Sequence, residues 1–244
     1  MVPFDPHVVR GDFPVLGREL RPGVTLAYLD SAATSLKPLS VIRAVTEYDA
    51  DYPANVHRGL HTLSERATEA YESARARVAS FIGAPDPDQV VFTRGTTESI
   101  NLVAQSWGRA FLRAGDEIVV SALEHHSNLV PWQMLARRVG LELKFAEMTE
   151  DGRLSVDALE RQLSGRTRLV AVTAMSNVLG TIPPLGDLID RAHRGGARVV
   201  VDAAQAVAHL PLDVTALDAD FVAFSGHKMC GPTGVGVLYA KREH

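Results

Sequence analysis

Short apolar runs rich in β-branched residues alternate with longer amphipathic stretches along most of this 244-residue chain. Runs of this kind, bounded by turn-forming residues, are typical of buried strands, and the stretches between them have helical spacing. Their alternation predicts an α/β fold, with a mostly parallel sheet covered by helices on both faces. We expect seven strands, near residues 90–93, 117–122, 141–147, 168–174, 197–202, 220–225 and 234–240, with helices such as 64–81 and 157–163 between or before them.

The two ends of the chain depart from this alternation. Residues 221–224 and 235–239 are joined by too few residues for a helical crossover, so the last strand is predicted to run antiparallel to its neighbour. Residues 1–25 are rich in Pro, Gly and charged residues, and we expect them to form an N-terminal arm on the surface. Residues 26–244 contain no repeat and no internal linker, and we expect them to form one large domain.

Composition excludes several classes of function. A hydrophobic fraction of 46% supports a full core, and a formal charge of −4 gives no electrostatic case for binding nucleic acid or a membrane surface. No apolar run reaches the length of a membrane span, and residues 1–6 lack the pattern of a signal peptide. The single Cys230 rules out an intramolecular disulfide framework. We therefore expect a cytoplasmic protein.

One lysine, Lys228, follows the apolar run 221–224 and precedes a loop rich in Gly and Pro. Burial at such a position lowers the pKa of a lysine and frees its neutral amine for Schiff-base chemistry. Lys228 is therefore a candidate for the covalent anchor of an aldehyde cofactor. A lysine at a strand end is more often a solvated cap, so the motifs elsewhere in the chain must decide between the two interpretations.

The run 197–202 ends in Asp202, and open α/β sheets hold ligands at the carboxyl ends of their strands. A carboxylate there could pair with a protonated pyridine nitrogen, and Gln205 could donate to a phenolate oxygen. The alternative is that Asp202 caps the next helix.

The run 90–93 leads into a glycine turn with two hydroxyls, Thr96 and Thr97, ahead of a helical pattern. Backbone N–H groups at a helix start, with Thr hydroxyls beside them, predict a phosphate cradle. Thr96 could instead be a simple N-cap, and the two roles are compatible.

Two histidines, His125 and His126, follow the predicted strand 117–122. A histidine at this edge can lie flat on an aromatic cofactor and exchange protons near neutral pH. Adjacent side chains point in different directions, so the two cannot both be assumed to face the pocket. We expect no metal site, because the chain has one cysteine and no HExxH pattern.

Seven stretches in order make the chain similar to the pyridoxal-phosphate cysteine desulfurases. It most closely resembles the sulfur-mobilisation (SUF-type) branch of the class V aminotransferase-like family. The resemblance implies a fold-type I pyridoxal-phosphate transferase whose cofactor-binding major domain is formed by residues 26–244. The matching stretches are YLDSAA (28–33), VHRG (56–59), RGTTE (94–98), EHH (124–126), SNVLG (176–180), VDAAQ (201–205) and SGHK (225–228).

Carried over position by position, the resemblance implies roles for individual residues of this chain. Lys228 would hold the aldehyde of pyridoxal 5′-phosphate, Asp202 would pair with its ring nitrogen, and His125 would stack on the ring and help to move protons. Gln205 would bond the phenolate oxygen, and Asn177 would lie near the substrate carboxylate or the phenolate edge. His57 matches a position near the active site without an assignable role. The phosphate would be held by Thr96, Thr97, Ser225 and His227, and the substrate-side wall would include Ala32 and Ala33.

The resemblance also implies an activity and partners. The enzymes convert L-cysteine to L-alanine and keep the sulfur as an enzyme-bound persulfide for iron–sulfur cluster assembly, which implies a homodimer and a possible sulfur-acceptor protein. Family members continue into a smaller C-terminal domain that carries the sulfur-accepting cysteine and an arginine for the substrate carboxylate. We expect this chain to be truncated before that domain, because it stops at His244, directly after the seventh predicted strand. Its only thiol, Cys230, lies two residues past Lys228 and does not match the family nucleophile. A cofactor-binding module without desulfurase turnover, or another class V aminotransferase or lyase, remains an alternative.

Overall fold

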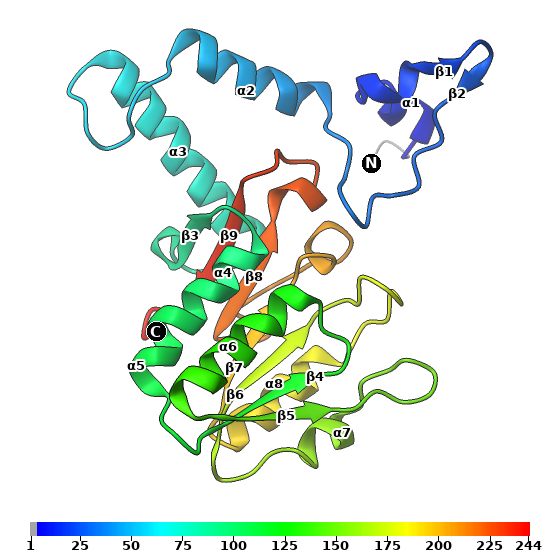
Figure 1. Cartoon of the computed structure of the whole chain (residues 1–244). Helices are drawn as coiled ribbons and strands as arrows, with labels where there is room; N and C mark the ends of the chain where they lie inside the picture. The colour runs from blue at the N-terminus through cyan, green and yellow to red at the C-terminus, as the bar shows by residue number, and fades with distance from the viewer. Residues whose placement is uncertain (1–3) are drawn as a thin grey trace.

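The computed structural model describes residues 4–244 and has a seven-stranded sheet at its centre (Figure 1). The strand order is β3-β9-β8-β7-β6-β4-β5. The strands from β5 to β8 are parallel, whereas β9 runs antiparallel to both β8 and β3. The strands are β3 (Val90–Thr93), β4 (Glu117–Ser121), β5 (Glu142–Ala146), β6 (Thr167–Thr173), β7 (Arg198–Asp202), β8 (Phe221–Ser225) and β9 (Gly236–Ala240).

The predicted fold class and the antiparallel last strand are confirmed. All seven predicted strands are present, and their ends differ from the predicted ones by at most two residues. The predicted helix 64–81 begins two residues earlier, as α3 (Thr62–Phe81), because His61 caps it by accepting from the Ser64 N–H at 3.4 Å. The predicted helix 157–163 is shorter, as α7 (Val156–Glu160), and is capped by Ser155.

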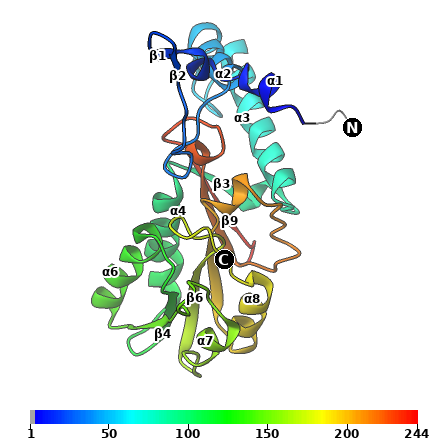
Figure 2. The same ribbon diagram turned by 90° about the vertical axis from the view of Figure 1, so that its right-hand side faces the viewer.

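Helices cover both faces of the sheet, as Figure 2 shows for α4 and α6 on one side and α8 on the other. The first group comprises α4 (Thr96–Val103), a π-helical turn (Ala104–Gly108), α5 (Arg109–Phe111) and α6 (Val130–Val139). The second comprises α7, α8 (Leu185–Arg194) and the end of α3. Short 3₁₀ turns follow the strands or precede them, at Pro87–Gln89, His126–Asn128, Ala206–Ala208 and Gly226–Lys228.

The side chains of each strand point alternately to the two faces of the sheet and form two hydrophobic cores, one on each face. In β4, Ile118 and Val120 pack with Trp132 of α6, whereas Val119 belongs to the core under α8. Successive side chains of a strand point to opposite faces, so a fully apolar strand is buried on both sides. The sheet is therefore rigid enough to fix the positions of the loops at its edges.

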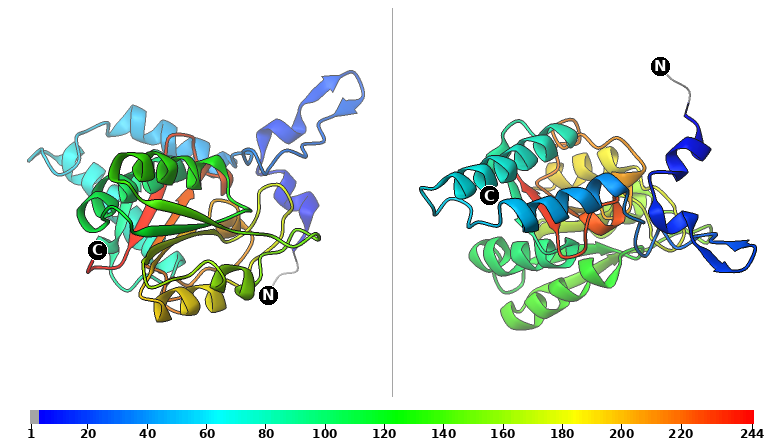
Figure 3. Two further views of the ribbon diagram at one scale, coloured as in Figure 1. Left: turned by 60° about the horizontal axis from the view of Figure 1, so that its bottom comes forward. Right: turned by 90° about the horizontal axis from the view of Figure 1, so that it is seen from above.

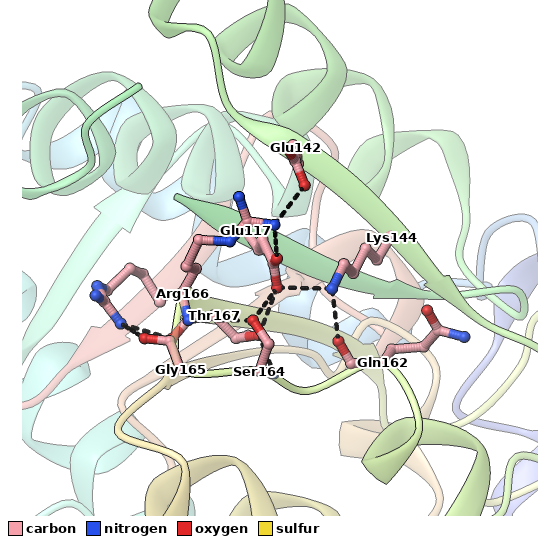
Figure 4. A network of polar contacts seen from close by, with 9 residues as sticks. Glu117, Glu142, Lys144, Gln162, Ser164, Gly165, Arg166 and Thr167 are labelled. Atoms are coloured by element: carbon pink, nitrogen blue, oxygen red, sulfur yellow. Dashed lines mark hydrogen bonds and ion pairs between the residues drawn. The ribbon is translucent and has the colours of Figure 1, made fainter. Parts of the chain in front are cut away.

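A network of polar side chains closes the edge of the sheet where β4 begins (Figure 4). The fully buried Glu117 carboxylate accepts from Ser164 at 2.6 Å, Arg166 at 2.7 Å and Thr167 at 3.1 Å, and it pairs with Lys144 at 2.8 Å. Burial raises the pKa of Glu117, but these hydrogen bonds outweigh it and lower the pKa to about 2. The network ties β4, β5 and β6 together at the edge opposite the carboxyl ends of these strands.

The first quarter of the chain lies outside the sheet, as Figure 3 shows from two sides. None of residues 4–25 is buried, and neither is any residue of α2. This region contains α1 (Pro6–Arg10), a 3₁₀ turn (Pro14–Gly17), the hairpin of β1 (Glu19–Arg21) and β2 (Val24–Thr25), and α2 (Leu39–Asp51). Between residues 4 and 244, no helix has both the length and the apolar character that crossing a membrane requires.

Candidate functional site

A cavity of about 520 Å³ opens where the parallel strands end, and every site residue predicted from the sequence lines it. The predicted residues come from six separate segments, the first at Ala32 and the last at Lys228. The right-handed crossovers of an α/β sheet bring such strand ends to one edge. The cavity is lined by Asp30, Ala32, Ala33, Thr96, Thr97, His125, Ser127, Thr173, Met175, Asn177, Asp202, Ala204, Gln205, Ser225, His227 and Lys228.

Lys228 reaches the cavity at the end of the short 3₁₀ turn that follows β8. Burial lowers the pKa of its amine, and the negative charge of Asp202 acts in the opposite direction. The neutral amine is therefore more accessible than in a solvated lysine, and neutral amine is the form that attacks an aldehyde.

Asp202 ends β7 and is only 4% exposed. Its Oδ1 accepts from the backbone N–H of Ala204 at 2.9 Å, whereas the N-cap of the 3₁₀ turn that follows (Ala206–Ala208) is Gln205, so the capping alternative for Asp202 is wrong. A carboxylate has lone pairs for a further donor, and Asp202 also lines the cavity. Burial raises the pKa of Asp202, while the Ala204 N–H and the positive charges of Lys228 and His125 act to lower it.

His125 is held by a hydrogen-bonded chain that begins on α4. Its Nδ1 accepts from the backbone N–H of Ser127 at 3.1 Å and lies 2.9 Å from the Ser127 hydroxyl. That hydroxyl also contacts the Thr97 hydroxyl at 2.7 Å. Because Nδ1 is an acceptor, the neutral imidazole carries its proton on Nε2. His126 does not line the cavity.

The start of α4 and the end of β8 form the predicted cradle. The Ser225 hydroxyl accepts from the Thr96 N–H at 2.8 Å and contacts the Thr96 hydroxyl at 2.7 Å. The N-cap is Gly95 rather than Thr96, so the simple capping alternative for Thr96 is wrong. A Cβ on Gly236 of β9 would lie 2.3 Å from the Cα of Gly95, so only glycine allows this close approach.

The segment 30–35 forms the opposite wall of the cavity. The Gln205 side-chain amide donates to the carbonyl of Ala32 at 2.8 Å, which leaves its second N–H for a ligand. The backbone N–H and hydroxyl of Ser35 donate to the carbonyl of His227, at 2.8 and 2.9 Å. Burial lowers the pKa of the His227 imidazole, as do the charges of Lys228 and Lys37.

Five of the lining residues were not predicted from the sequence. Thr173 ends β6 beside Asp202, so its position at a strand end is a signal that could have identified it. Ser127 lies within the same stretch as His125, but its contacts with His125 and Thr97 depend on the folded loop. Asp30 and Ala204 lie within the matching stretches YLDSAA and VDAAQ, which could have identified them, whereas Met175 carries no comparable signal.

Two residues singled out in the sequence lie elsewhere. Cys230 is not among the lining residues, and its N–H donates to the Ser35 hydroxyl at 2.7 Å with a left-handed φ of 65°. The His57 imidazole pairs with Glu72 at 3.0 Å and packs edge-on against Tyr71, also away from the cavity.

Comparison with known proteins supplies the family. Residues 27–244 match the family described as Aminotransferase class-V. The chain belongs to this family. It is 55% identical over 240 residues to a cysteine desulfurase of Cronobacter sakazakii, a match that covers 98% of this chain and 59% of the relative.

Solved structures of cysteine desulfurases have the same fold. The apo enzyme of Thermococcus onnurineus superposes with a TM-score of 0.91 at 46% identity, covering 100% of this chain and 59% of that one. The Escherichia coli enzyme CsdA, in an S-sulfonic acid form, superposes with a TM-score of 0.88 at 47% identity. This match covers 99% of the present chain and 59% of CsdA. The class V chain described here therefore spans about three fifths of the length of these relatives.

Pyridoxal 5′-phosphate is the cofactor of the class V family, and the cavity fits it. The cofactor carries an aldehyde, a basic ring nitrogen and an anionic phosphate. Lys228 offers an amine with a lowered pKa, Asp202 a buried carboxyl, and the start of α4 backbone N–H groups with hydroxyls beside them. Among residues 4–244, no group of His, Cys, Asp and Glu is arranged to hold a metal ion.

Proposed function

We propose that the protein to which this chain belongs is a cysteine desulfurase, with residues 26–244 as its cofactor-binding major domain. The observation that carries the proposal is the meeting of Lys228, Asp202 and His125 in one cavity, in a chain 55% identical to a protein named cysteine desulfurase. L-Cysteine is the proposed substrate. The Cβ–S bond breaks, a proton takes the place of sulfur on that carbon, and the sulfur joins a thiolate as a persulfide.

Each polar group of the cavity has a role in this proposal. Bound pyridoxal phosphate supplies an electron sink for the charge that develops on the substrate carbon. Lys228 binds the cofactor aldehyde and, once released, moves the α-proton of the substrate. Asp202 keeps the ring nitrogen protonated through its negative charge. His125 presents Nε2 to the substrate side and relays protons there.

The remaining lining residues bind and orient. Gln205 donates its second amide N–H to the phenolate oxygen, and Asn177 lies near the substrate carboxylate. Ala32 and Ala33 leave room for the substrate because their side chains are small. The phosphate is held by Thr96, Thr97, Ser225 and His227.

The sulfur acceptor and the partners complete the proposal. The accepting thiolate is not Cys230, which does not line the cavity. Apolar side chains outside the sheet, such as Leu29, Leu60 and Val178, are 95%, 100% and 81% exposed, which supports a homodimer. A sulfur-acceptor protein, a place in iron–sulfur cluster assembly, the SUF-type branch and a cytoplasmic location belong to the same proposal.

A lyase of the same family would use the same cavity, and product analysis distinguishes the two. A desulfurase incubated with L-cysteine forms alanine, with sulfur that a thiol reductant releases as sulfide. A β-eliminating lyase forms pyruvate and ammonia together with sulfide. We expect alanine as the organic product of the protein, and a Lys228→Ala variant should form none. Pyruvate in place of alanine would contradict the desulfurase proposal and support the lyase.

A further inference from the structure

The carboxyl group of Glu124 lies immediately behind the cavity and joins three elements. Its Oε1 contacts the Ser121 hydroxyl at the end of β4 and accepts from the Thr173 N–H of β6 at 2.6 Å. Its Oε2 accepts from the Asn128 side-chain amide at 2.7 Å. Asn128 in turn accepts from the Trp132 indole at 3.0 Å. Glu124 does not line the cavity, so these contacts leave it no direct part in binding.

The partners of Glu124 position two residues of the site. Thr173 pairs in register with Asp202, and the backbone N–H of the next residue, Ala174, donates to the Asp202 carbonyl at 2.8 Å. Asn128 donates its backbone N–H to the carbonyl of His125 at 2.8 Å. One carboxyl group therefore supports both the strand end that presents Asp202 and the turn that presents His125.

The carboxyl groups of Glu124 and Asp202 have different charged neighbours. The hydrogen-bond partners of Glu124 are all neutral (Ser121, Asn128 and Thr173), and the charged side chain that acts on it is Asp202. Asp202 itself is stabilised by the positive charges of Lys228 and His125. Burial raises the pKa of Asp202 as well, but Lys228 and His125 act to lower it. Two nearby buried acids cannot both ionise cheaply, so we assign the proton to Glu124, the acid without a cation beside it. Burial, with a smaller contribution from Asp202, raises the pKa of Glu124 to about 8 against the effect of its hydrogen bonds.

We propose that Glu124 is a positioning residue of the site, a neutral carboxylic acid that ties β4 to β6 and leaves Asp202 as the fixed negative charge beneath the cofactor. In this form Glu124 donates its O–H to the Ser121 hydroxyl, the reverse of the bond that this hydroxyl donates to an ionised Oε1, while it accepts from Thr173 and Asn128. The inference deepens the proposed function but depends only on the family cofactor site, not on desulfurase turnover.

Unfolding of the cofactor-free protein tests the protonation state. The folded chain retains the Glu124 proton between pH 4.5 and about 8, whereas the unfolded chain releases it, so this group lowers stability as pH rises through that window. Glu124→Gln removes the titration but keeps the shape. The folding constant of the Gln variant relative to wild type should rise by up to about tenfold per pH unit from pH 5 to 8 and then level off.

Exposed Glu147 supplies the matched control, because Glu147→Gln should give a ratio that is constant over the same range. A flat or falling ratio for Glu124→Gln, measured against this control, would show that Glu124 is ionised in the folded chain and would overturn the proposal. This outcome does not involve the reaction, so it is separate from any failure of the desulfurase assignment.

Exchange of the α-proton of bound L-alanine in D₂O, followed by NMR on the cofactor-loaded protein, tests the positioning role. Glu124→Ala leaves buried donors unpaired and should slow exchange about tenfold, whereas Glu124→Gln keeps one acceptor oxygen and should slow it only about threefold. Gln and Ala variants that are equally impaired would contradict a neutral acid. Wild-type exchange in the Ala variant, or in the Gln variant if the Ala variant does not fold, would overturn the positioning role.

Discussion

Asp202 and Glu124 illustrate how neighbours decide the charge of a buried acid. Both carboxyl groups are removed from water, and burial raises the pKa of each. Asp202 faces Lys228 and His125, whereas Glu124 faces a hydroxyl, an amide and a backbone N–H. In the proposed assignment these neighbours make Asp202 the charged acid and Glu124 the neutral hydrogen-bonding group.

Asp202→Ala tests the first of these two assignments. The variant keeps the cradle of Thr96 and Ser225, so it should bind pyridoxal phosphate with little loss. It removes the charge beside the ring nitrogen, so α-proton exchange should fall about a hundredfold or more. Bound cofactor is measured by absorbance and exchange by NMR. Equal losses of binding and exchange would show that Asp202 is only structural.

At the scale of elements, the site depends on how closely β9 passes the start of α4. The missing side chain of Gly236 lets Gly95 approach, and this contact places the Thr96 N–H against Ser225. Gly236→Ala forces two backbones apart and should destabilise the chain by about 1–3 kcal/mol while weakening cofactor binding. Denaturant unfolding and absorbance titration measure the two effects.

Gly186→Ala in α8 is the matched control for this glycine. No atom lies within 4 Å of its added Cβ, so stability should stay the same or rise slightly. Unchanged cofactor affinity in the Gly236 variant would mean that the β9–α4 contact does not shape the cradle.

A second prediction at the scale of elements concerns the Glu117 network, which lies at the edge of the sheet away from the cavity. In the folded chain the pKa of Glu117 is lowered from 4.5 to about 2. The Glu117 carboxylate therefore contributes stability above pH 4.5, and this stability is lost as the pH falls to about 2. Glu117→Gln should therefore be less stable than wild type at pH 6, and the gap should close towards pH 2. A gap that is independent of pH would contradict the ionised network.

The elements show what sequence can and cannot predict. Strands were located to within two residues because continuous apolar runs end in Gly, Pro or polar residues, and Lys228 and Asp202 follow from their positions at strand ends. The exposed helix α2 was not predicted, because none of its residues is buried. The contact between Thr97 and Ser127, and the contacts of Glu124 with Thr173, arise from how separate segments meet, which no local pattern encodes.

The whole molecule joins distant parts of the chain in one site. Gln205 bonds to Ala32, 173 residues earlier, and Ser35 bonds to His227, so the N-terminal segment completes a cavity that the sheet begins. The chain spans about three fifths of the length of its relatives. The central claim is that this cavity holds pyridoxal phosphate on Lys228.

Borohydride reduction followed by peptide mapping tests that claim most directly. The purified chain is loaded with pyridoxal phosphate, reduced, digested and sequenced by mass spectrometry, with Lys228→Ala as the control. The account predicts a single phosphopyridoxyl adduct on Lys228, in the peptide that contains Ser225-Gly226-His227, and none in the control variant. An adduct on another lysine such as Lys37, or no adduct on a folded chain, would contradict it.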